Sequence, residues 1–186
     1  MDIVTWLLEQ NVEVAVPPLF GFFTQYFANT KFDRKAYLKN SGNDRITDAL
    51  LEIYVNHFVA RVEGVMKSFH LYRQSHDLNK LASETSRTVS LANQAGEGWL
   101  LTAEMIAMLH SGINDIVCMQ PFGCLANHIT GKGISQKLKT LYPGVNLLFL
   151  DMDPGHSEVN IQNRLHFIVT AAKDAPRSLD HVRFYG

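Results

Sequence analysis

The chain has 186 residues, of which 46% are hydrophobic and 19% charged, and its formal net charge at pH 7 is -1. Such a composition can form a substantial hydrophobic core and excludes a disordered chain. The near-neutral charge gives no electrostatic reason to expect nucleic acid or an anionic membrane as a partner. Two neighbouring cysteines, Cys118 and Cys124, are too few for a secreted disulfide scaffold. We therefore expect a protein of the reducing cytoplasm.

The first half of the sequence predicts mostly helix. A short amphipathic helix at 2–10 leads into a strand at 12–16, which Pro17-Pro18 ends. Aromatic residues at 19–27 indicate a second helix. The clearest helical periodicity of the chain covers 46–69, with apolar residues at i, i+3, i+4 and i+7. A further helix is predicted at about 77–92.

The second half alternates regularly between helix and strand. A helix at 100–112 ends at Gly112, and a buried strand, DIVCMQ, follows at 115–120. A basic helix is predicted within 129–144. The apolar run NLLFLD at 146–151 indicates another buried strand, and a helix at 157–173 follows it.

This order of elements predicts an α/β fold with three layers and a short parallel sheet, to which the N-terminal half adds a helical layer. The three strands at 12–16, 115–120 and 146–151 are expected to lie parallel in one sheet. We expect one domain over residues 1–173, a helical insertion at about 19–95, and a loosely packed tail at 174–186.

Right-handed crossovers place the C-terminal ends of parallel strands at one edge of the sheet, where ligands of open α/β sheets bind. Gln120, Gly123 and Cys124 follow the strand at 115–120, and Asp151 ends the next strand. Because burying a bare carboxylate is costly, Asp151 is expected to accept hydrogen bonds from backbone N–H groups of the loops. These four residues are the candidate site.

The two cysteines have different predicted roles. Cys124 lies in a glycine-flanked loop just past a strand, where a thiolate can reach a metal or a cluster. It can equally be a small buried hydrophobic residue. Cys118 lies within the strand and is expected to pack into the core. The spacing C-x5-C matches no zinc motif, and Gly131-Lys132-Gly133 fails the Walker pattern because Ala126 and Gly133 hold two of its required positions.

Three motifs in the second half carry a resemblance to a known family. They are GEGWLLTAEM at 96–105, QPFGCLANHITGKG at 120–133 and DMDPGHSEVNIQNR at 151–164. In these motifs the chain resembles the C-terminal part of the large acyl-CoA dehydratase activase-related proteins, relatives of the activator and dehydratase components of 2-hydroxyglutaryl-CoA dehydratase. The N-terminal half matches more loosely.

The resemblance implies a role in an ATP-dependent electron-transfer system that contains an iron–sulfur cluster. It implies Cys124 as a cluster ligand, with Gln120, Gly123 and Asp151 lining the cofactor site. The chain lacks the ATPase domain and further loop cysteines, so the site must be completed by other domains of the parent protein or by a dehydratase component. We expect no cluster in the isolated domain. Two alternatives are a non-catalytic docking module and a flavodoxin-like domain that binds a phosphorylated ligand.

Overall fold

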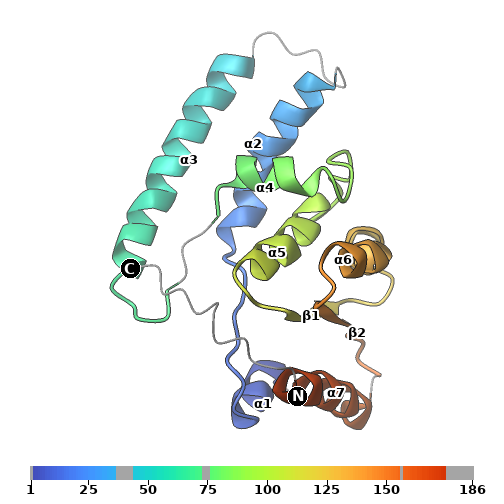
Figure 1. Cartoon of the computed structure of the whole chain (residues 1–186). Helices are drawn as coiled ribbons and strands as arrows, with labels where there is room; N and C mark the ends of the chain where they lie inside the picture. The colour runs from blue at the N-terminus through green and yellow to red at the C-terminus, as the bar shows by residue number, and fades with distance from the viewer. Residues whose placement is uncertain (1, 37–43, 73–75, 156, 175–186) are drawn as a thin grey trace. The chain divides into compact units, whose positions relative to one another are not determined.

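The computed structural model describes residues 2–36, 44–72, 76–155 and 157–174 (Figure 1). The chain divides into two compact units. The first, here called the sheet unit, comprises Met1–Pro17 and Glu104–Gly186; the second, the helical unit, comprises Pro18–Ala103. The predicted insertion at 19–95 falls within the helical unit. The predicted tail lies outside the described residues from 175 onward.

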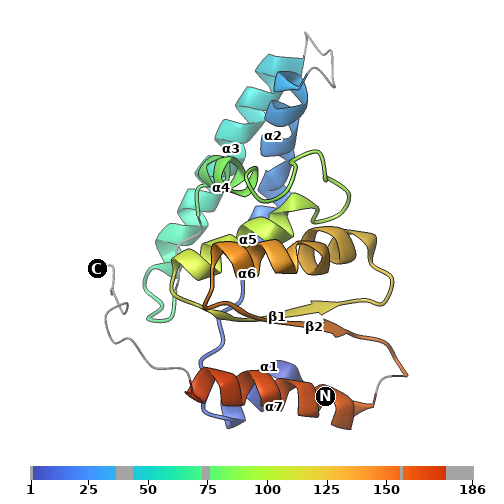
Figure 2. The same ribbon diagram turned by 45° about the vertical axis from the view of Figure 1, so that its right-hand side comes forward.

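The sheet unit is built on two parallel strands. Strand β1 (Asp115–Gln120) pairs with β2 (Asn146–Asp151), in a register that places Gln120 opposite Asp151. Helices α1 (Ile3–Glu9) and α7 (Glu158–Asp174) cover one face of this sheet (Figure 2). The other face is covered by α6 (Ser135–Leu141) and by the C-terminal part of α5 (Trp99–His110). The predicted α/β fold with a short parallel sheet is confirmed.

One apolar cluster joins α1, β2 and α7. Helix α7 places a single stripe of side chains at i, i+4, i+7 and i+8 against the sheet. The buried members of the cluster are Ile3, Leu7, Leu150, Ile161, Leu165, Ile168 and Val169. At the edge of the cluster, the Trp6 ring meets the His166 ring edge-on, with 4.8 Å between centroids. Burial of this stripe fixes α7 against the strand that carries Asp151.

The prediction of a strand at 12–16 is wrong. This segment has no strand conformation in the structure, and the sheet formed by the described residues has two strands. A short apolar run ended by prolines fits an extended segment as well as a strand, because only a strand needs a paired neighbour. Val12 and Val14 pack against the apolar cluster without a strand ladder, and the Val12 N–H donates to Leu7 O at 3.2 Å.

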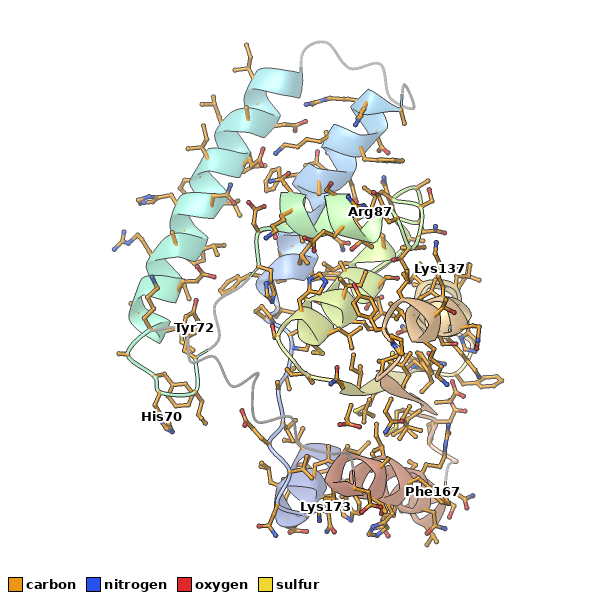
Figure 3. The ribbon with its side chains drawn as sticks, in the orientation of Figure 1. His70, Tyr72, Arg87, Lys137, Phe167 and Lys173 are labelled. Carbon is orange, nitrogen blue, oxygen red and sulfur yellow. The ribbon has the colours of Figure 1, made fainter. Side chains whose placement is uncertain are left out.

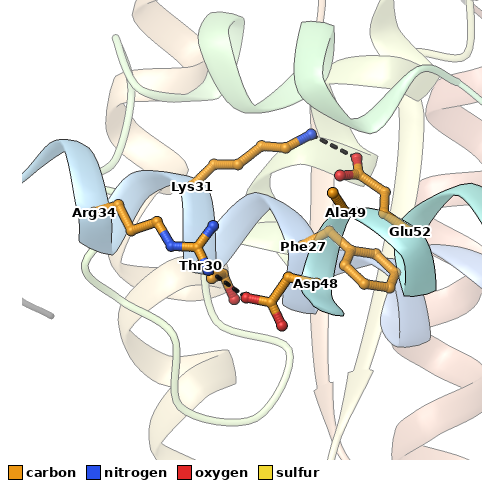
Figure 4. A pocket seen from close by; sticks show the side chains of 7 residues that line it. All are labelled: Phe27, Thr30, Lys31, Arg34, Asp48, Ala49 and Glu52. Carbon is orange, nitrogen blue, oxygen red and sulfur yellow. Dashed lines mark hydrogen bonds and ion pairs between the residues drawn. The ribbon is translucent and has the colours of Figure 1, made fainter. Parts of the chain in front are cut away.

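The helical unit contains α2 (Phe20–Lys35), α3 (Asp44–Met66) and α4 (Leu78–Thr85). Helix α4 is shorter than predicted, because its C-terminal cap is Ser86 and turns follow. Ionic contacts join α2 to α3: Lys31 Nζ lies 2.5 Å from Glu52 Oε1, and Arg34 pairs with Asp48 (Figure 4). These pairs border a small hollow of about 100 Å³ between the two helices.

Helix α3 leaves most of its large apolar side chains exposed. Two of its acidic residues, Asp48 and Glu52, form ion pairs with α2. The exposed apolar residues of α3 are Ile46, Leu50, Leu51, Ile53, Tyr54, Phe58, Val65 and Met66. We call this set the α3 apolar face. Such a concentration of exposed hydrophobic side chains is typical of an interaction surface.

Among the described residues, no helix combines the length and the apolar character needed to cross a membrane.

Candidate functional site

The ends of the two strands meet in a direct side-chain contact. Gln120 Nε2 donates a hydrogen bond to Asp151 Oδ1 at 2.5 Å, and the Met152 N–H continues the ladder to Gln120 O at 2.7 Å. Only 1% of the Gln120 surface is exposed. The prediction for Asp151 named backbone N–H groups as donors; the donor found is a side-chain amide, because the parallel register places Gln120 opposite it.

The carboxylate of Asp151 is stabilised in its charged form. The Gln120 hydrogen bond is the main cause that lowers the pKa of Asp151 below its ordinary value of 3.8. Partial burial opposes this shift, and the positive charges of Lys132, His128 and Arg164 assist it. The strand edge therefore holds a carboxylate among three basic side chains.

Gln120 also carries an unused hydrogen-bonding group. Its Oε1 is buried and has no hydrogen-bond partner among the described residues. Because Nε2 is committed to Asp151, the amide cannot turn over without placing Oε1 against the carboxylate. Buried acceptors without donors are uncommon in proteins and need an explanation.

A tight turn places Cys124 at the same edge. The Cys124 N–H donates to Pro121 O at 3.2 Å, and Gly123 has φ 73° at the third position of the turn. Only glycine adopts this conformation without a steric cost, and nothing lies within 4 Å of the position its Cβ would take. The chain then enters a helical turn, in which the His128 N–H donates to Cys124 O at 3.0 Å.

The two cysteines lie as predicted, Cys118 buried and Cys124 partly exposed. One side chain connects them. Asn127 donates from Nδ2 to Cys124 Sγ at 3.0 Å, and its Oδ1 accepts from Cys118 Sγ at 3.7 Å. Asn127 is 7% exposed. The ring nitrogen Nδ1 of His128 lies 2.9 Å from Cys124 O, so the His128 side chain also contacts the backbone of this turn.

The Gly131-Lys132-Gly133 segment has a structural explanation. A π-helical turn covers Asn127–Gly131, and the Lys132 N–H closes it by donating to Asn127 O. A Cβ at Gly133 would lie 3.0 Å from His128 O, tighter than ordinary packing allows. A glycine therefore fits this turn without the small shift of backbone that a side chain would need.

The structure brings Gln120 and Asp151 into direct contact and places Gly123 and Cys124 in the adjoining turn. The sequence interpretation missed Asn127, Lys132 and Arg164 as members of this edge. Asn127 follows Cys124 by three residues, the spacing at which helical side chains meet, and this signal could have identified it. Arg164, whose Nη2 donates to Phe149 O at 2.7 Å, lies on α7 and has no comparable local signal.

The side chains at this edge can supply one ligand of an iron–sulfur cluster. Among the described residues there is no group of three or more His, Cys, Asp or Glu side chains that could hold a metal ion. An iron–sulfur cluster takes cysteine thiolates as ligands, commonly four. Cys124 fits one of these positions, and its neighbour Asn127 supplies an N–H to the sulfur. The remaining ligands would have to come from outside this edge.

One hollow in the described residues lies away from the strand ends. It has a volume of about 390 Å³ and is lined by Asn163, His166, Phe167 and Thr170 of α7. Phe167 projects from the helix with 78% of its surface exposed (Figure 3). All four lining residues belong to one helix, so this is a shallow depression along its surface. We therefore base the candidate site on the strand ends.

No family model, no curated protein and no solved structure shows significant similarity to the chain. The family membership suggested by the sequence motifs accordingly stays a prediction, as does the cytoplasmic location.

Proposed function

We propose that this chain is a domain of an activase-related protein of the 2-hydroxyacyl-CoA dehydratase system. It contributes Cys124 to an iron–sulfur redox site that other domains or a dehydratase component complete. The single observation that carries the proposal is the position of Cys124: partly exposed, in a turn directly after β1, with an N–H aimed at its sulfur. When bound, such a cluster transfers one electron at a time.

The surroundings of Cys124 support a cofactor edge in two ways. Asn127 donates to the sulfur, and outer hydrogen bonds of this kind orient and tune metal ligands. The Oε1 of Gln120 is a buried acceptor without a partner among the described residues, and a group of a docked domain can supply the donor. Asp151 holds the Gln120 amide in the orientation that leaves this acceptor available.

The test uses the full-length protein that carries this domain, purified without oxygen. We expect Cys124→Ser to lower both iron and acid-labile sulfide, because the variant loses a thiolate ligand. Cys118→Ser is the matched control: it sits in the same strand–turn segment but is buried, so iron and sulfide should stay unchanged. Retention of the cluster in folded Cys124→Ser would contradict the ligand assignment.

A second candidate function, a docking module without redox chemistry, is favoured by the α3 apolar face. The occupant we assign to it is a helix of a partner component of the same system. Asp48 and Glu52 of α3 form ion pairs with α2, while His57 and Arg61 are exposed beside the apolar residues. A fitting partner helix would present an apolar stripe flanked by carboxylates.

The two functions are separated by one comparison. The double variant Leu50→Ser, Ile53→Ser should weaken binding of the dehydratase component measured by calorimetry, and it should leave iron content unchanged. If Cys124→Ser leaves iron unchanged and the α3 variant abolishes binding, the docking module replaces the redox domain. If the α3 variant binds the component as the wild type does, this surface has no docking role.

A further inference from the structure

We propose that the outer edge of β1 is a dimerisation surface, along which a second copy of this chain adds its own β1 in antiparallel orientation. The two short sheets then form one continuous sheet in the order β2–β1–β1–β2, with a two-fold axis at Val117. This surface is independent of the proposed iron–sulfur site, because it uses the long side of the strand and not the turn that follows it.

The backbone of β1 bonds to β2 along one side. At the two ends of the pairing, the Asn146 N–H donates to Asn114 O at 2.8 Å, and the Met152 N–H donates to Gln120 O at 2.7 Å. Successive residues of a strand direct their N–H and C=O groups to opposite sides. Every even-numbered residue of β1 therefore points these groups toward β2, and every odd-numbered residue points them away.

The odd-numbered residues of β1 are Asp115, Val117 and Met119. Among the described residues, the backbone groups of Val117 and Met119 form no hydrogen bond, and no third strand lies beside β1. A row of unpaired N–H and C=O groups on an edge strand is a template for pairing with another chain. The Met119 side chain, 49% exposed, is accessible at the end of this row.

The other edge of the sheet is better protected. On β2 the outward-pointing C=O of Phe149 accepts a hydrogen bond from Arg164 Nη2 of α7 at 2.7 Å. Natural edge strands avoid unwanted pairing through lysine, proline or a bulge. The β1 sequence DIVCMQ contains no lysine and no proline, and its register with β2 is continuous, without a bulge. Pairing between chains is therefore directed to β1.

A second copy of β1 suits this edge in charge and in sheet size. In an antiparallel pair about Val117, each outward N–H meets an outward C=O, and Asp115 faces Met119 of the second copy. The one charged residue of the strand is thus kept away from its counterpart. The formal net charge of -1 leaves little repulsion between two copies. The combined sheet reaches a common size, and each half already has helices on both faces (Figure 2).

The test combines sedimentation velocity of the 186-residue chain under reducing conditions with hydrogen exchange of assigned backbone amides. On dilution, the sedimentation coefficient should fall from the dimer value to the monomer value. In the same series, the amides of Val117 and Met119 should exchange roughly tenfold faster, or more, once the dimer dissociates. The amides of Ile116 and Cys118 donate to β2 in both states and are the internal controls.

Two substitutions at one exposed position test the antiparallel arrangement. Met119→Glu places a carboxylate opposite Asp115 of the second copy, twice across the axis, and should raise the dissociation constant about tenfold. Met119→Lys places a cation opposite the same carboxylate and should leave the constant unchanged or lower it. Circular dichroism verifies that both variants fold. Equal dissociation constants for the two variants would overturn the antiparallel pairing.

Three further results would contradict the dimer. One is a chain that stays monomeric throughout the concentration series. Another is a dimer in which the amides of Val117 and Met119 exchange as fast as in the monomer, since its interface would lie elsewhere. The third is protection of these amides in the monomer, or only after the dehydratase component is added. The edge of β1 would then belong to another segment of the chain or to that partner.

Discussion

Two helices with similar apolar periodicity have opposite environments in this protein. Helix α7 buries its stripe against β2, and Leu165 at its centre is 0% exposed. Helix α3 turns Asp48 and Glu52 toward α2 and leaves Ile53 with 66% of its surface exposed. Periodicity identifies a helix and its apolar side, but it does not identify what covers that side.

The comparison shows that α7 and α3 are held in their units by different means. The sheet unit relies on a shared apolar cluster, in which each side chain is covered by several others. The helical unit joins α2 to α3 through ion pairs at partly exposed positions, which contribute less per contact than buried apolar side chains. The helical unit also buries the Trp99 ring, whose Nε1 donates to Asn29 Oδ1 at 2.6 Å.

The largest predicted effect tests this difference directly. Leu165→Ala in α7 should lower the free energy of unfolding by about 2–5 kcal/mol, because it leaves a cavity in the cluster. Ile53→Ala in α3 is the matched substitution at an exposed site and should change it by about 0.5 kcal/mol or less. Urea denaturation followed by circular dichroism measures both. A large loss in Ile53→Ala would mean that α3 is covered in solution.

The second prediction concerns the strand ends. Asp151→Ala should lower the free energy of unfolding by about 1–3 kcal/mol, because it leaves the buried Nε2 of Gln120 without an acceptor. Asp153→Ala, two residues further along and beyond the end of β2, is the control and should have a smaller effect. Thermal or urea denaturation of both variants gives the comparison. Equal stability of Asp151→Ala and the wild type would show that the Gln120 contact does not persist in solution.

A third prediction tests whether the helical unit depends on local contacts. Asp77 caps α4: its Oδ1 accepts from the Asn79 N–H at 2.8 Å and from the Lys80 N–H at 3.3 Å. Asp77→Ala should cost about 0.5–2 kcal/mol, whereas Asp77→Asn, which keeps an acceptor, should cost less. Hydrogen exchange measured by mass spectrometry should show faster exchange in α4 and unchanged exchange in α7. Faster exchange in both helices would mean that the effect of the lost cap is not confined to α4.

The sequence predicted well those parts of the fold that depend on local pattern. Both buried strands, β1 and β2, and the helices α5 and α7 were predicted close to their observed positions, because apolar runs and caps are local signals. The extra strand at 12–16 was wrong for a nonlocal reason. Pairing requires a neighbouring strand, and a short apolar run alone cannot supply one.

The candidate site was predictable in its position but only partly in its contacts. The rule for parallel sheets placed Gln120 and Asp151 at one edge, and the register then brought their side chains together. The link from Cys118 through Asn127 to Cys124 depends on the way the π-helical turn directs a side chain back toward β1. Sequence spacing can suggest the contact between Asn127 and Cys124, but not the contact between Cys118 and Asn127.

The smallest predicted effect is a dependence of stability on pH at the strand ends. The Gln120 hydrogen bond lowers the pKa of Asp151 in the folded chain below its ordinary value of 3.8. Above that value Asp151 is ionised in both states, so its contribution to stability is fully present. As the pH falls below 3.8, the unfolded chain binds the proton first, and the contribution is lost by the time the pH passes the folded pKa.

Asp151→Asn cannot titrate, so its unfolding free energy should fall less between pH 5 and pH 3 than that of the wild type, as measured by urea denaturation at each pH. Asp2, whose pKa is lowered mainly by a hydrogen bond from the Thr5 side chain, titrates in both proteins and cancels in the difference. Parallel pH profiles for the wild type and Asp151→Asn would mean that the ionised Asp151 carboxylate is no more stable in the folded chain than in water. The edge of the sheet would then be more accessible to water than the buried core beneath α7.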